Sequence, residues 1–187
     1  MTTRAPIRAA LALTGALLAA SALGQATETF TATASAKTKT GPITAPVRIT
    51  ISRHSTAEER KITADALKTG GTHAVQAAVS TMPDCGTLNV GEKTVPIKYA
   101  TSRSTGSGRL LTVLTDQPIA HIGSNLPDAK PKTGYDVAVA LLILDEKSAG
   151  HGEIDMAAKV KMNKSGAIEV EGYSGLKIWL KNIKKIL

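Results

Sequence analysis

Side chains that could do acid–base or nucleophilic chemistry gather in one long connection, residues 116–136. It holds Asp116, His121 and Ser124. Histidine is the most frequent general base in proteins, and a nucleophilic serine needs such a base and an orienting acid. Connections of this length are often functional. These three residues are therefore the candidate catalytic residues of a hydrolase.

The same connection also has a plainer interpretation, as a surface excursion. Residues 118–122 would then add an edge strand to a sheet. The chain contains neither a Gly-x-Ser-x-Gly elbow nor a Ser-x-x-Lys motif, which would have supported a nucleophilic serine. We favour the surface excursion, and we lean against an enzyme.

Metal and nucleotide sites are not predicted. The four histidines are spread along the chain, and none has a partner at a recognised metal-binding spacing. Residues 86–94 nearly match a phosphate loop, but Glu92 separates Gly91 from Lys93 and Thr94. A carboxylate at that place repels phosphate, and a strand-like segment follows where a helix is needed. We expect no metal and no cofactor.

A basic segment near the C-terminus offers a possible contact with an anionic surface. As an amphipathic segment it would dock on anionic lipid or on an envelope polymer. As a strand it would turn its apolar residues inward and its lysines to solvent, which is the commoner arrangement and the one we favour. The candidate contact residues are Lys177, Trp179, Lys181, Lys184 and Lys185.

Composition excludes several classes of protein and partner. Of the 187 residues 42% are hydrophobic and 20% charged, which is typical of a folded chain. The net charge is +8, but only 3% of residues are aromatic, too few for the stacking platforms that bind nucleic acid or sugars. Cys85 is the only cysteine, so an internal disulfide is impossible.

The N-terminus predicts export. Arg4 and Arg8 precede a run of alanine and leucine that is too short for a membrane span and is followed by small residues. We interpret residues 1–26 as a cleaved signal peptide. The mature chain then has no transmembrane span, and the protein is periplasmic or secreted.

Two helices are predicted after the first strands. Residues 27–45 indicate a short strand and a loose connection, and residues 47–53 alternate as a half-buried strand does. Ser55 and Glu58 form a capping-box pattern at the start of a helix that Gly70 and Gly71 end. A second helix over residues 72–81 would complete a helical hairpin.

Strands are predicted from there to the C-terminus. Residues 95–99 alternate, with Pro96 indicating an edge or a bulge, and residues 109–115 form another strand. Residues 137–144 are apolar on both faces, as in a central strand covered on both sides. Residues 158–162 and 168–171 predict a hairpin, because one register places apolar residues opposite apolar ones and lysines opposite glutamates. The predicted pairs are Met162 with Ile168, Val160 with Val170, Lys161 with Glu169 and Lys159 with Glu171.

Together these elements predict an α+β fold, a helical hairpin packed on an antiparallel β-meander. The single domain would span residues 46–187, after the signal peptide and the N-terminal segment 27–45. Short motifs in order along the chain, among them 55–60, 96–100 and 115–119, resemble a group of uncharacterised exported bacterial proteins. The resemblance implies an exported single domain and brings no activity.

The function we expect is non-catalytic. An exported domain of this kind would bind a ligand or associate with the cell envelope, with an anionic envelope surface or polymer as the partner and no role for nucleic acid. The alternative is an exported hydrolase with its site in the 116–136 loop.

Overall fold

The computed structural model describes residues 26–38, 41–120, 133–163, 168–173 and 177–186. Within these ranges the chain forms ten strands and one helical element. The helix, α1, is Ala57–Ser80. The strands are β1 (Glu28–Thr38), β2 (Gly41–Ile51), β3 (Gly86–Val90), β4 (Lys93–Ile97), β5 (Tyr99–Thr105), β6 (Gly108–Leu114), β7 (Val137–Asp145), β8 (Ala149–Met162), β9 (Ile168–Gly172) and β10 (Trp179–Lys185).

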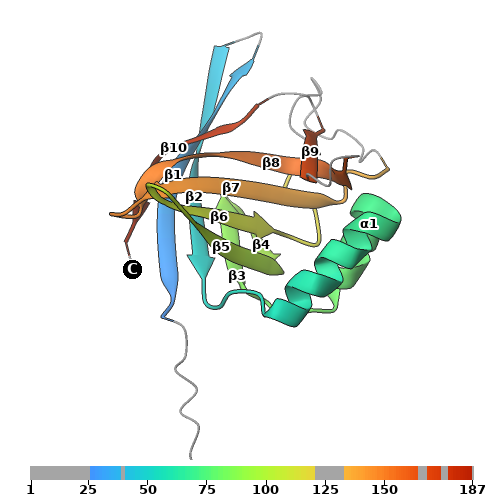
Figure 1. The fold of residues 1–187 in the computed structure, drawn as a ribbon. Coiled ribbons are helices and arrows are strands. Elements are labelled where there is room, and N and C mark those ends of the chain that lie inside the picture. The colour runs from blue at the N-terminus through green and yellow to red at the C-terminus, as the bar shows by residue number, and fades with distance from the viewer. Residues whose placement is uncertain (1–25, 39–40, 121–132, 164–167, 174–176, 187) are drawn as a thin grey trace, which may run out of the picture.

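The strands form one antiparallel sheet that curls into a nearly closed barrel (Figure 1). Their order is β4-β3-β2-β1-β10-β8-β7-β6-β5, with β9 paired to β8 outside this path. The expected α+β fold, a helical hairpin packed on a β-meander, is therefore wrong. The barrel curls because β10 inserts between β1 and β8, which joins the first and last parts of the described chain.

The N-terminal segment belongs to this sheet. Residues 28–38 pair with residues 41–51 along their whole length, where a short strand and a loose connection were expected. In Figure 1 the β1–β2 hairpin, drawn in blue and cyan, extends beyond the barrel. Residues 47–51 of β2 pair with β3 on the side away from β1, while residues 41–46 extend beyond β3. This extension carries Pro42 and Pro46, which lack an N–H and so hinder pairing with a further strand.

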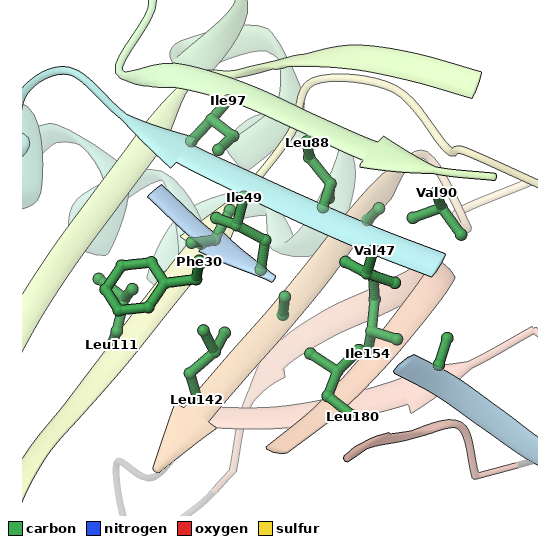
Figure 2. Packing of buried hydrophobic residues seen from close by; sticks show 14 of the residues in the cluster. Phe30, Val47, Ile49, Leu88, Val90, Ile97, Leu111, Leu142, Ile154 and Leu180 are labelled. Carbon is green, nitrogen blue, oxygen red and sulfur yellow. The ribbon is translucent and has the colours of Figure 1, made fainter. Parts of the chain in front are cut away.

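The barrel interior is the larger of two hydrophobic cores. Figure 2 shows side chains from facing walls, among them Phe30, Ile49, Leu142 and Leu180, pointing toward one another. All four are almost completely buried. The interior also explains why one face of β7 is apolar, because the side chains on that face point into it. These are Ala138, Ala140, Leu142 and Leu144.

The second core lies between the outside of the barrel and α1. Val137 and Val139 of β7 turn outward and pack with Leu67, Val75 and Val79 of the helix. The prediction that β7 is covered on both sides is confirmed, although a barrel wall replaces the expected second layer. No helix in the described part of the chain is long and apolar enough to cross a membrane.

The helix begins one residue later than the capping pattern predicted. Thr56 is the N-cap, and its hydroxyl and the Glu59 carboxylate form the capping box. Ser55 is instead buried, and its hydroxyl accepts a hydrogen bond from the Ala100 N–H of β5 at 3.1 Å. Gly71, at φ +61°, interrupts the helix with a kink inside one helical element, where the sequence predicted the end of a first helix.

Strands β8 and β9 pair in the predicted register. Lys161 lies opposite Glu169 with 3.2 Å between Nζ and Oε2, and Val160 lies opposite Val170. The predicted turn at residues 164–167 lies outside the described residues. The C-terminal segment is a strand, as favoured, with Leu180 and Ile183 of β10 buried and its lysines turned outward.

Candidate functional site

A groove with a volume of about 590 Å³ lies between α1 and the outside of the barrel. Helix α1 lies on one side of the barrel in Figure 1. It forms one wall of the groove through Arg60, Thr63, Ala64, Leu67 and Val75. This volume lies in the range of pockets that hold one small organic ligand.

The floor of the groove is the outer face of β5, β6 and β7. Side chains alternate along a strand, so every second residue turns outward while its neighbour faces the barrel interior. Ala100, Leu111 and Leu142 face inward. The outward residues that line the floor are Tyr99, Thr101 and Arg103 of β5, Leu110, Thr112 and Leu114 of β6, and Val139 and Leu141 of β7.

The side chains of this floor change from polar on β5 to apolar on β7. Thr101 of β5 lies opposite Thr112 of β6, which lies opposite Leu141 of β7. In the adjoining row Arg103 lies opposite Leu110. The β5 side of the floor is therefore polar and cationic, and the β7 side is apolar.

The far wall continues the apolar side. It consists of Val160 of β8 and of Ile168 and Val170 of β9. Thr72 of α1 fastens the helix to this wall, because its hydroxyl donates to the Val160 carbonyl at 3.1 Å and accepts from the Val160 N–H at 2.8 Å. The separation between helix and sheet is thus fixed by a buried polar contact.

Both charged residues in the described lining are arginines. Arg60 donates from Nη1 to the Ser55 carbonyl at 2.7 Å, and Ser55 is itself bound to Ala100 of β5. Arg60 is thereby held at the β5 side, the side that carries Arg103. Neither guanidinium forms an ion pair with a carboxylate of a described residue, and the described lining contains no aspartate or glutamate.

Tyr99 adds an uncharged hydroxyl to the cationic end. Burial raises the pKa of the Tyr99 phenol, and the positive charge of Arg60 opposes that rise in pKa. The phenol therefore stays protonated at neutral pH and can donate a hydrogen bond. Both side chains line the same groove.

Of the three predicted catalytic residues, the structure describes only Asp116. Asp116 lies just after β6, and its Oδ1 is buried and makes no hydrogen bond to a described residue. Its carbonyl accepts from Gln76 Nε2 of α1 at 3.0 Å. His121 and Ser124 lie outside the described residues, so the hydrolase stays a prediction.

The C-terminal candidates have different surroundings. Lys177 lies 5.5 Å from the ring centre of Trp179 and 3.7 Å from Glu153. Lys185 Nζ lies 2.9 Å from Glu28 Oε1, at the start of β1. All five residues are exposed, but only Lys181 and Lys184 form neither an ion pair nor a ring contact with another described residue.

A pair of carboxylates on β8 was not anticipated from the sequence. Glu153 and Asp155 share the outward face of the strand, beside Leu141 and Val139 respectively. Burial raises the pKa of Asp155, and the nearby Glu153 carboxylate raises it further. No group of three or more potential metal ligands occurs among the described side chains.

Sequence reasoning also missed the groove. One signal was available, because β7 is apolar on both faces and so requires a cover outside as well as inside. The arginines gave no such signal, since Arg60 and Arg103 come from different elements and line one groove only because the Ser55–Ala100 contact holds Arg60 at the β5 side.

Comparisons of the chain with protein-family models, with curated protein sequences and with solved structures each found no match. The groove is therefore the feature of the molecule that bears on its function.

Proposed function

We propose that this protein is an exported, non-catalytic binding protein that holds a ligand with an apolar body in the groove between α1 and β5–β9. The observation that carries the proposal is the groove itself, about 590 Å³ in volume, on the outside of an already complete barrel core. Typical ligand pockets have this size and combine a mostly apolar lining with a few polar groups.

The lining favours binding over catalysis. Its described residues include leucines and valines on three sides, with threonine, tyrosine and arginine at one end. They include no histidine, cysteine, aspartate or glutamate, the side chains that most often act as general bases. Such a lining can enclose and orient a molecule, and it offers no nucleophile paired with a base.

The test uses a neutral, polarity-sensitive fluorophore, N-phenyl-1-naphthylamine, with the purified protein. We expect saturable enhancement with one molecule bound per chain. Ile168→Glu places a carboxylate on the groove wall, at a side chain that is 63% exposed and therefore tolerant of substitution. This variant should bind the probe at least ten-fold more weakly, because a charge beside the bound probe must be desolvated.

Ile43→Glu is the matched control. Ile43 is also an exposed strand isoleucine, at 43%, and lies on β2 away from the groove. Its substitution should leave probe affinity within two-fold of the original. Absence of saturable binding, or equal loss in both variants, would refute a ligand in this groove.

A further inference from the structure

We infer that the occupant of the groove is a single-chain amphiphile with an anionic head group, its head over Thr101 and its chain directed toward β9. This inference rests on the proposed function and adds the class and the orientation of the ligand. It follows from where the charges lie and from how polarity changes across the floor.

The charge of the lining selects an anion. Arg60 and Arg103 bring two positive charges, and no carboxylate of the described lining offsets them. A guanidinium presents its N–H groups in a planar fork that fits carboxylate and phosphate oxygens. Either head group would satisfy the same site, so the shared chemistry is an oxyanion.

The position of the head follows from β5. Thr101 lies between Tyr99 and Arg103 on the outward face, about 6.6 Å along the strand from each. Arg60 is held at the start of β5 through Ser55, which is hydrogen-bonded to Ala100, so a head group over Thr101 lies between the two arginines. The hydroxyls of Thr101 and of its partner Thr112 provide further donors on the same row.

The direction of the chain follows from the opposite end. From Thr112 the floor passes to Leu141, and the far wall beyond the floor is formed by Val160 and Val170. Glu153 of β8 lies beside Leu141, so an anionic head at that end would be repelled by a carboxylate, and a charge among the valines would lose its hydration. A volume of about 590 Å³ suits one chain better than the two chains of a diacyl lipid.

The test is displacement of bound N-phenyl-1-naphthylamine from the full chain by four compounds of equal chain length, below their micelle-forming concentrations. These are hexadecanoate, hexadecyl phosphate, hexadecanol and hexadecyltrimethylammonium. We expect one or both anions to bind about ten-fold more tightly than the alcohol, with the cation weakest, and we expect added salt to reduce the difference.

Variants locate the head group. Arg60→Gln and Arg103→Gln should each weaken anion binding several-fold and leave hexadecanol within two-fold, while Arg103→Lys keeps most of the preference. Arg48→Gln removes an exposed arginine of β2 outside this groove and should change nothing.

The outcomes separate the two proposals. If the probe binds but hexadecanol competes as well as both anions, the groove binds apolar ligands and the anionic head is wrong. If the anion preference survives both glutamine substitutions, the head lies elsewhere and the orientation is wrong. If the probe never binds, the proposed function fails first.

Discussion

Replacing Glu28 with glutamine should destabilise the barrel where its first and last strands meet. Glu28 lies at the start of β1, and its side chain is only 14% exposed. Its oxygens accept hydrogen bonds from Arg109 of β6 at 2.8 and 3.1 Å and from Lys185 of β10 at 2.9 Å. Glu28→Gln keeps the shape of the side chain and removes its charge.

The size of the effect follows from these contacts. A hydrogen bond to a charged group contributes about 1.5–3 kcal/mol when buried, and an exposed ion pair about 0–1 kcal/mol. Arg109 and Lys185 are partly exposed, at 24% and 36%, which places the set between these limits. We expect Glu28→Gln to lower the free energy of unfolding by about 2 kcal/mol at pH 7.

The effect should depend on pH with a definite sign. Burial alone would raise the pKa of Glu28, but hydrogen bonds from Arg109 and Lys185 outweigh it, and the pKa lies below its usual value of 4.5. The stabilising effect is therefore complete above the pKa of the unfolded chain and is lost as the pH falls through the lower folded pKa. The difference between the two proteins should be constant near neutral pH and shrink below pH 4.5.

Urea unfolding followed by circular dichroism, at several pH values, measures this difference. The matched control is Glu169→Gln, which removes the carboxylate that pairs with Lys161 on an exposed surface and should change stability little. The reasoning would be refuted if both variants lost the same stability. It would also be refuted if the effect of Glu28→Gln were as large at pH 3 as at pH 7.

Two further measurements examine the helix attachment and the basic strand. Thr72→Val should lower the free energy of unfolding by about 1–3 kcal/mol, because it leaves the buried N–H and carbonyl of Val160 without the threonine hydroxyl. In a urea titration, Thr72→Ser should recover most of that loss, because serine keeps the hydroxyl. Equal losses of stability in the two variants would contradict this explanation. The protein should cosediment with vesicles of anionic phospholipid at low salt, and the double variant Lys181→Gln, Lys184→Gln should bind them several-fold more weakly. If the original protein does not sediment with the vesicles, the envelope contact is ruled out.

Local pairing was predictable because short-range pattern determines it. In the β8–β9 hairpin a single register places Val160 opposite Val170 and Lys161 opposite Glu169, and a slip of one residue would bury the charges. The strand at β10 was predictable for the same reason, since Ile178, Leu180 and the intervening Trp179 alternate in burial.

The closure of the sheet was not predictable from such patterns. The alternation of apolar and polar residues along a strand predicts which of its faces is buried, but it does not predict which distant strand pairs with it. Phe30 of β1 has Lys185 of β10 as its partner, and nothing local to either residue specifies the other. Consequently the outward cover of β7 was foreseen, while its inward cover, the opposite wall of a barrel, was not.

The helix start shows how a one-residue ambiguity in sequence is decided by tertiary contacts. Ser55 and Thr56 are both good N-cap residues, each followed three positions later by a glutamate. Arg53 decides between them, because its guanidinium holds Glu59 through two hydrogen bonds of 2.9 and 3.0 Å. Thr56 then caps the helix, and Ser55 is left to bind β5 and to position Arg60 in the groove.

The insertion of β10 between β1 and β8 also has a consequence for how the protein acquires its structure. Hairpins such as β1–β2 can form as soon as their residues are made, but the barrel cannot close before β10 is present. Contacts between such distant segments carry a large loop-closure entropy and slow folding. The export that we predict from the N-terminal sequence would benefit from this order of events. The chain would stay unfolded enough to cross a membrane until its last strand is synthesised.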